Sequence, residues 1–181
     1  MHHRSILIVD DSRTNRDVMG RRLAEQGYLV ALAENGREAL DMIAGRAFDL
    51  VLLDMVMPGL SGLDVLAEIR GDRQNADLPV VMVTGRSDAE AAVRALAAGA
   101  DDHIAKPFTF DVLFARVARV LARGRRLADL KRANAALDAR IAVRAMELGE
   151  ARSDLAIART DRERLVASLA ALHDEVTRLR G

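Results

Sequence analysis

The stretch Ser5-Ile-Leu-Ile-Val9-Asp10-Asp11, near the amino terminus, joins a short aliphatic run to two acidic residues. Four more short, mostly aliphatic runs follow it along the chain, at 28–32, 49–53, 79–83 and 102–105. Short runs of this kind, without a polar face, are typical of parallel strands that are buried on both sides. The sequence therefore predicts a five-stranded parallel sheet.

Helical patterns lie between these runs. Three of them place a capping residue three positions before an acid: Asn35 with Glu38, Ser61 with Asp64, and Ser87 with Glu90. Strands that alternate with helices predict an α/β fold in which helices cover both faces of a doubly wound sheet. In such sheets ligands bind at the carboxyl ends of the strands.

Composition narrows the class of protein. The 181 residues suit one domain with an extension, and 50% apolar with 30% charged residues suits a folded core. Aromatic residues make up only 3%, which argues against stacking platforms for single-stranded nucleic acid. Cysteine is absent, which excludes disulfides and thiolate chemistry. With no apolar run of membrane-spanning length and no signal peptide, we expect a soluble, cytoplasmic protein with no membrane partner.

Polar residues follow the predicted strands where a site is expected. Asp10 and Asp11 end the first run, and the later strand ends carry Asp54, Thr84 and Lys106. Three carboxylates at one sheet edge repel one another unless a hard cation lies among them, and Mg²⁺ suits such an oxygen-rich site. A carboxylate nucleophile, a metal, a hydroxyl and an ammonium are what phosphoryl transfer to a carboxylate requires.

These residues resemble the receiver domain of bacterial two-component response regulators, of the chemotaxis-regulator type. The resemblance covers about residues 4–121 and rests on five separate motifs: Ile-Leu-Ile-Val-Asp10-Asp11, Leu-Leu-Asp54-Met-Val-Met-Pro58-Gly, Val-Thr84-Gly, Ala98-Gly-Ala100-Asp-Asp and Lys106-Pro107-Phe. It implies a flavodoxin-like fold and a receiver domain over residues 1–121, followed by an extension over residues 122–181.

The resemblance also implies a role for each site residue. Asp54 would be the phosphoacceptor, and Thr84 and Lys106 would contact the phosphoryl group. Mg²⁺ would be held by oxygen ligands only: Asp10, Asp11, Asp54 and the backbone carbonyl of Val56. The Lys106–Pro107 peptide would be cis. The phosphoryl group would come from a sensor histidine kinase or a phosphotransfer protein, and we expect no enzymatic turnover beyond self-phosphorylation from small donors and autodephosphorylation.

Two positions depart from the family pattern. The switch residue that works with Thr84 is usually Tyr or Phe, and here it is His103, a smaller and titratable ring. Val56 and Arg86 occupy the positions that tune hydrolysis in the family. Neither side chain positions water well, so we expect a long-lived aspartyl phosphate.

The last 55 or so residues follow a heptad pattern. Steps of three and four from Leu127 to Leu179 pass through eleven large aliphatic residues, two alanines, Asn134, Arg144 and Arg162. A sustained period of 3.5 residues predicts a coiled coil, and Asn134 at an a position favours two parallel strands. Three charge pairs across a parallel dimer would attract: Glu147 with Arg152, Asp154 with Arg159, and Glu175 with Arg180. We therefore expect a homodimer; the alternative is an antiparallel hairpin that turns near Gly149.

The predicted coiled coil is continuous with the last receiver helix. The same spacing runs backward through Leu113, Arg116, Val120 and Arg123, so the two helices should splay at these charged core positions. The region 116–144 holds nine basic and two acidic residues. This basic collar raises DNA binding as a rival function, but it is tethered to an acidic domain and we expect no nucleic-acid partner.

Two further rivals concern the protein as a whole. A phosphatase of the haloacid-dehalogenase type also uses an aspartate nucleophile with Mg²⁺, but it needs an Asp-x-Asp motif that Asp10-Asp11-Ser12 lacks. Alternatively, the chain is the regulatory amino-terminal fragment of a larger protein whose output domain, a cyclase, kinase or phosphatase, is absent here. The leading hypothesis is a response regulator that signals through a dimeric coiled coil.

Overall fold

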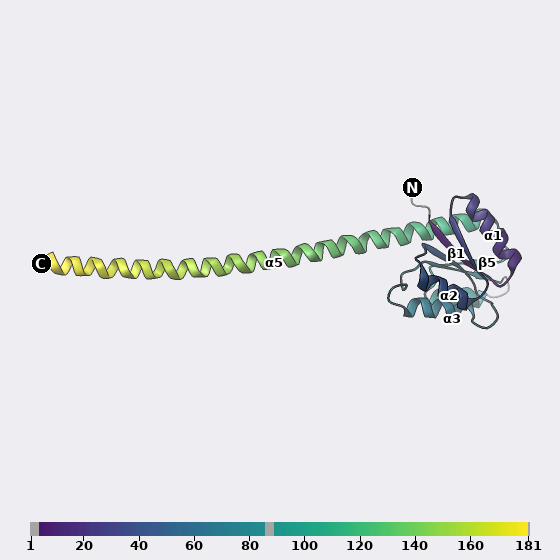
Figure 1. Ribbon diagram of the computed structural model, residues 1–181, viewed down its shortest axis with the longest axis horizontal. Coiled ribbons are helices and arrows are strands. Elements are labelled where there is room, and N and C mark those ends of the chain that lie inside the picture. Colours follow the sequence, from purple (N-terminus) through teal and green to yellow (C-terminus); the bar gives the residue numbers. More distant parts are fainter. Residues whose placement is uncertain (1–3, 86–88, 181) are drawn as a thin grey trace. The chain divides into compact units, whose positions relative to one another are not determined.

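The computed structural model describes residues 4–85 and 89–180, in which strands and helices alternate along the chain (Figure 1). The strands are β1 (Ser5–Val9), β2 (Leu29–Ala33), β3 (Leu50–Asp54), β4 (Val80–Thr84) and β5 (Asp102–Ala105). The helices are α1 (Arg13–Glu25), α2 (Gly36–Gly45), α3 (Gly62–Gly71), α4 (Ala89–Ala97) and α5 (Phe110–Arg180). Three of the strands, β2, β3 and β4, begin and end one residue later than the sequence predicted.

All neighbouring strands pair in parallel, in the order β2-β1-β3-β4-β5. This flavodoxin-like order confirms the predicted doubly wound sheet. From β1 the chain continues to β2 on one side, and β3 to β5 are then added on the other side of β1. The topological switch point therefore lies between β1 and β3, and ligands of such sheets bind in the crevice at the carboxyl ends of these two strands. The fold therefore places a site beside Val9 and Leu53, which are partners in the register of β1 and β3.

Alternate residues of β1, β3 and β4 build two hydrophobic cores, one on each face of the sheet. On one face, Leu7, Val51 and Met82 pack with apolar residues of α2, α3 and α4. On the other face, the neighbouring strand residues pack with Leu23 of α1 and with Leu113 of α5. Because both faces are covered, strands without a polar face are the stable choice, as the sequence predicted.

Local signals set the start of two helices as predicted. Asn35 caps α2 by accepting the backbone N–H of Glu38, and Ser61 and Asp64 form a complete capping box at α3. The predicted cap Ser87 lies outside the described residues. Ser12 also caps a helix, α1, because its side chain accepts the backbone N–H of Asn15; this cap was not predicted.

The start of α3 lies directly against the end of β3. A Cβ atom at Gly62 would come within 2.1 Å of the carbonyl oxygen of Asp54 and 2.8 Å of the Cα of Met55. No side chain fits there, so glycine lets the helix approach the backbone that carries Asp54.

Helix α5 runs from Phe110 to Arg180 without interruption. It passes through Gly149, so the alternative of an antiparallel hairpin within the chain is wrong. By their internal contacts the residues form two units, Met1–Ala128 and Asp129–Gly181. Among the described residues no helix is long and apolar enough to cross a membrane.

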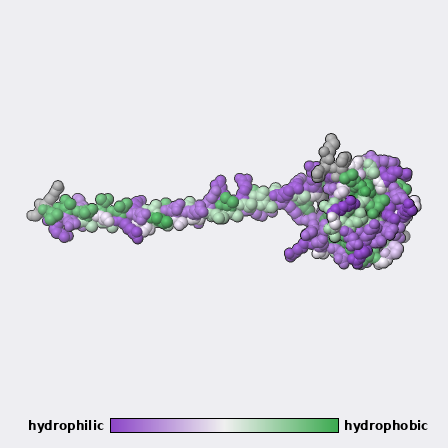
Figure 2. Space-filling view, in the orientation of Figure 1, coloured by the Kyte–Doolittle hydropathy of each residue, from purple (hydrophilic) through white to green (hydrophobic). Residues whose placement is uncertain are grey.

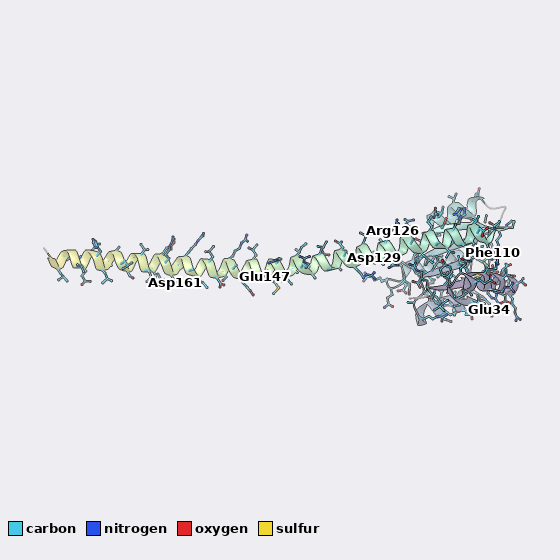
Figure 3. The ribbon with its side chains drawn as sticks, turned by 90° about the horizontal axis from the view of Figure 1, so that it is seen from above. Glu34, Phe110, Arg126, Asp129, Glu147 and Asp161 are labelled. Atoms are coloured by element: carbon cyan, nitrogen blue, oxygen red, sulfur yellow. The ribbon has the colours of Figure 1, made fainter. Side chains whose placement is uncertain are left out.

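The second unit consists of the part of α5 that begins at Asp129, and this part carries most of the heptad seam. Every large aliphatic residue of the seam is exposed, from 45% at Leu127 to 81% at Leu179. Figure 2 shows apolar and polar patches alternating along this helix, and Figure 3 labels Glu147 and Asp161 on it. The apolar stripe along this part of α5 is therefore open to solvent.

The predicted extension of the seam back to Leu113 is wrong. Leu113 and Val120 are buried in the core against β4 and β5, at 0% and 3% exposure. Arg116 is not an unpaired core charge, because its Nη1 donates to Asp102 Oδ1 at 2.7 Å. The sheet covers this stripe of α5, so a second helix has no access to it.

Asp102 ties the start of β5 to α5. Its buried carboxylate also accepts from Arg119 Nη2 at 2.7 Å and from the backbone N–H of His103 at 2.9 Å. Burial alone would raise its pKa, but the hydrogen bonds from Arg116, His103 and Arg119 together lower it. Asp102 therefore stabilises the fold above its unfolded pKa of about 3.9, and this contribution is lost as the pH falls through the folded pKa.

We expect Asp102→Asn to lower the free energy of unfolding by about 1–2 kcal/mol at pH 7, since both arginines are partly solvated. The loss should shrink toward zero as the pH falls below about 4. Urea denaturation at several pH values measures it. Asp129→Asn, which breaks an exposed pair with Arg132, is the matched control. A loss for Asp102→Asn that is equal at pH 7 and pH 3 would contradict the assignment.

Candidate functional site

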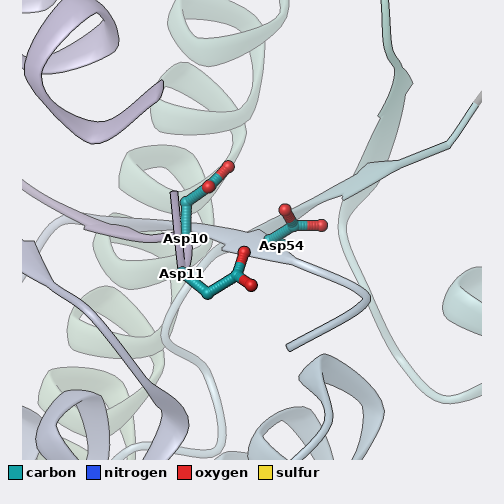
Figure 4. Close-up of side chains that lie close together, drawn as sticks. All are labelled: Asp10, Asp11 and Asp54. Carbon is teal, nitrogen blue, oxygen red and sulfur yellow. The ribbon is translucent and has the colours of Figure 1, made fainter. Parts of the chain in front are cut away.

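Three carboxylates meet at the switch point of the sheet. Asp10 and Asp11 follow β1, and Asp54 ends β3 beside them (Figure 4). One oxygen from each lies within 4.8 Å of the others. Asp10 and Asp54 are 0% and 8% exposed, whereas Asp11 is exposed. The structure thus brings together the three acidic residues that the sequence predicted for a metal.

Lys106 reaches this cluster from the end of β5. Its Nζ donates to Asp54 Oδ2 at 2.5 Å and to Asp10 Oδ2 at 2.8 Å. The peptide bond to Pro107 is cis, as expected. The backbone N–H of Lys106 donates to the carbonyl of Thr84 at 2.7 Å, which places the ends of β4 and β5 level with each other.

The charges of the cluster depend on one another. Burial opposes ionisation of Asp10, but the hydrogen bond and positive charge of Lys106 outweigh it and lower the pKa of Asp10. At Asp54 burial prevails and, aided by the negative charge of Asp10, raises the pKa despite Lys106. Burial disfavours the charged form of Lys106, yet its hydrogen bonds to Asp10 and Asp54 raise its pKa. Lys106 is therefore a firmly held cation between two acids of unequal basicity.

The other predicted residues lie around the cluster. Thr84 is 1% exposed at the end of β4. Val56 is 76% exposed, and its backbone N–H donates to Asp54 Oδ1 at 3.3 Å. Arg86, the second predicted hydrolysis-tuning residue, lies outside the described residues.

His103 lies on β5, in register with Met82 on β4. Its Nδ1 is buried and, among the described residues, has no hydrogen-bond partner. A buried ring nitrogen without a partner costs free energy, so the predicted switch residue occupies a poorly satisfied position.

The prediction missed the residues that hold the loop between β1 and α1. Asn15 Nδ2 donates to both carboxylate oxygens of Asp10, at 3.2 and 3.3 Å, and the N–H of Ser12 donates to Asp10 Oδ1 at 2.9 Å. Arg16 donates to the backbone of the same loop. The helix-start signal at Ser12 could have found them, because it places Asn15 and Arg16 in the first turn of α1, facing back toward the acidic pair.

The donor set fits a hard divalent cation. Three carboxylates offer only oxygen ligands, and exposed Asp11 leaves room for water, as Mg²⁺ prefers. When bound, the ion would offset the negative charge of the acids and of a phosphoryl group. With a buried carboxylate, a hydroxyl and an ammonium at neighbouring strand ends, fold and site define a doubly wound α/β protein whose acidic pocket suits a divalent cation and a phosphoryl group.

Residues 6–118 match the model of the response regulator receiver domain family, and the chain belongs to that family. It is 45% identical over 118 residues to the response regulator MprA of Mycolicibacterium vanbaalenii. The matched stretch makes up 65% of this chain and 50% of that protein. The chain spans about half the length of the curated relatives it matches. The family is that of two-component response regulators, whose receivers bind Mg²⁺ at the acidic pocket and are phosphorylated there.

Solved structures agree with this assignment. A putative response regulator from Chloroflexus aurantiacus is 34% identical with a TM-score of 0.65, covering 67% of this chain and 99% of its own. The Vibrio cholerae chemotaxis protein CheY4 is 31% identical with a TM-score of 0.63, and the match covers 66% of this chain and 99% of CheY4. The receiver domain of NtrX from Brucella abortus is 40% identical with a TM-score of 0.61, and the match covers 65% of this chain and 98% of the NtrX domain.

The coupled acids predict how Lys106 acts on stability without metal. Lys106→Met should lower the free energy of unfolding by about 2 kcal/mol at pH 7 in EDTA, because two neighbouring carboxylates lose their shared cation. Asp10 has a lowered pKa and so stabilises the fold only above its unfolded value; this contribution is lost as the pH falls. The difference from wild type should therefore shrink below about pH 4.

Thermal melts across this pH range measure the effect, and Lys131→Met, a change at an exposed lysine of α5, is the control. Equal melting temperatures for wild type and Lys106→Met at pH 7 would rule out the ion pairs as a stabilising element.

Proposed function

We propose that Asp54 is the phosphoacceptor of this protein. The observation that carries the proposal is the bridge from Lys106 to Asp10 and Asp54, which brings three strand ends to one point. The phosphodonor is a sensor histidine kinase or a phosphotransfer protein, and the exchange takes place in the cytoplasm. The absence of cysteine suits that reducing compartment.

Each residue then has one part in the transfer. A carboxylate oxygen of Asp54 forms the new bond to phosphorus while the bond from phosphorus to the donor nitrogen breaks. Lys106 turns from the Asp54 oxygen to a phosphoryl oxygen, and the Thr84 hydroxyl donates to another. Asp10, Asp11, Asp54 and the Val56 carbonyl would hold Mg²⁺, which would supply positive charge to offset that of the transferred group.

The chain is a phosphoacceptor and not a turnover enzyme. It takes phosphoryl groups from small donors and loses them by autodephosphorylation. The exposed Val56 side chain has no polar group to position an attacking water. The aspartyl phosphate is accordingly long-lived.

We also propose that the signal leaves through helix α5 in a parallel homodimer. The exposed heptad seam of α5 supports this, because burying its leucines against a second copy removes a long apolar stripe from water. The first turns of α5 pack on the strands that carry the switch, since Leu113 and Val117 share a core with Val83 and Ile104. Movement of Thr84 and His103 on those strands is then felt by α5.

The test of the phosphoacceptor uses acetyl phosphate with Mg²⁺ and intact-protein mass spectrometry. Wild type should gain one phosphoryl group and Asp54→Asn none, because an amide is not a nucleophile here. Asp41→Asn, a change at an exposed aspartate of α2, should behave as wild type. Lys106→Arg should be impaired, since a planar guanidinium does not replace a compact ammonium. Phosphorylation of Asp54→Asn at the wild-type level would refute the assignment.

The test of the dimer is disulfide cross-linking combined with sedimentation. Leu179→Cys should cross-link rapidly to its twin, because d positions of parallel strands face each other across the seam. Ala142→Cys, at an outer b position, should cross-link slowly in the same dimer. A protein that sediments as a dimer while Leu179→Cys does not cross-link has antiparallel strands, and a monomer at high concentration removes the coiled coil from the mechanism.

A further inference from the structure

Arg16 lies in the first turns of α1 and turns back under the loop that carries Asp10 and Asp11. Its Nη1 donates to the backbone carbonyl of Asp10 at 2.6 Å and to that of Asp11 at 3.0 Å. Only 13% of this charged side chain is exposed. A guanidinium is rarely buried to this degree unless its donors are used, so the two carbonyls are the reason for its position.

These two hydrogen bonds act on the direction of the acidic side chains. Each carbonyl belongs to a rigid peptide plane, and fixing that plane limits where the neighbouring Cβ atoms point. Asp10 is held further by Asn15 and by the Ser12 amide, whereas among the described residues the exposed side chain of Asp11 makes no hydrogen bond or ion pair. The orientation of Asp11 therefore depends mainly on its backbone, and its backbone depends on Arg16.

The charge of Arg16 acts in the same sense. A guanidinium beside the loop offsets part of the repulsion among Asp10, Asp11 and Asp54 before any cation arrives. Glu34, with which Arg16 forms an ion pair, lies at 3.9 Å and is largely exposed, so it offsets the charge of Arg16 only weakly. Lys106 offsets the repulsion on the side of the phosphoacceptor, and Arg16 offsets it on the side of the loop.

We infer that Arg16 is a positioning residue of the divalent-cation site, which sets the directions of Asp10 and Asp11 without touching the ion. This inference rests on the proposed function of the acidic cluster as a Mg²⁺ site. Residues that orient metal ligands from behind commonly change metal affinity by about 10–100-fold when they are replaced. Arg16 should show this behaviour although it contributes no ligand atom.

The test compares Arg16→Gln and Arg16→Lys with Arg13→Gln. Arg13 lies on the same helix, is 88% exposed and pairs only loosely with Asp17 at 3.7 Å, so it is a matched control. Mg²⁺ alone is titrated at constant ionic strength and followed by backbone amide NMR shifts. Phosphorylation by acetyl phosphate is then measured as a function of Mg²⁺ concentration, and thermal melts establish that each variant is folded.

We expect Arg16→Gln to raise the dissociation constant for Mg²⁺ about tenfold and Arg13→Gln to leave it unchanged. The maximal phosphorylation rate of Arg16→Gln should recover at saturating Mg²⁺, because the nucleophile is intact. A purely structural role would instead lower the maximal rate without moving the Mg²⁺ dependence. Arg16→Lys keeps the charge but lacks the fork that spans two carbonyls, so its dissociation constant should also rise, by a smaller factor.

Each outcome decides the inference. If Arg16→Gln does not fold, the test passes to Arg16→Lys, and a wild-type Mg²⁺ affinity of that variant overturns the inference. Loss of the fold in both variants overturns it too, because Arg16 would then serve stability alone. Unchanged Mg²⁺ affinity in a folded Arg16→Gln overturns it as well. A wild-type protein that neither binds Mg²⁺ nor accepts a phosphoryl group refutes the proposed function itself, and so the two failures are distinguishable.

Discussion

Three carboxylates at one edge of the sheet repel one another, and the arrangement of the neighbouring residues depends on compensating this repulsion. Asp10, Asp11 and Asp54 lie within hydrogen-bonding range of a common centre, and two of them are buried. Such a cluster is stable only where cations and hydrogen-bond donors compensate it. Lys106 does so from the end of β5. On the other side, the Ser12 N–H and the side chains of Asn15 and Arg16 do so from the loop before α1 and from the first turns of α1. The negative charge that remains is also what suits the cluster to a divalent metal, so the cost to stability and the chemistry of the site have one origin.

The apolar stripe of helix α5 lies in two different environments, the protein core at its start and solvent further along. Between Leu113 and Leu121 the stripe is buried against the sheet, whereas from Leu127 onward its residues are exposed. The helix itself continues without a break, so what changes along it is only what covers it. Asp102, through Arg116 and Arg119, anchors the covered part to β5. The covered part of α5 is thereby fixed to the start of β5, whereas the rest of the helix is exposed.

The sequence misled where a periodic pattern has more than one physical cause. The spacing from Leu113 to Arg123 satisfies a heptad, but a helix that packs on a sheet also repeats its apolar residues every three or four positions. Only the sheet, built from residues distant in the chain, separates these two cases. Arg16 is a case in which local signals give only part of the answer. The cap at Ser12 places it in the first turns of α1, but its burial arises because the loop before α1 folds back over it, and local patterns do not encode that fold.

The sequence by itself determined the five strands, the helix starts at Asn35 and Ser61, and the residues at the strand ends. These follow from local chemistry: apolar runs without a polar face require burial on both sides, and capping residues satisfy the free N–H groups of a helix. The tertiary structure alone decided which carboxylates approach Lys106, which part of α5 is covered, and which donors hold the acidic loop. Distances of this kind depend on the order and register of the strands, which bring residues 10, 54 and 106 to one point although long segments of chain separate them.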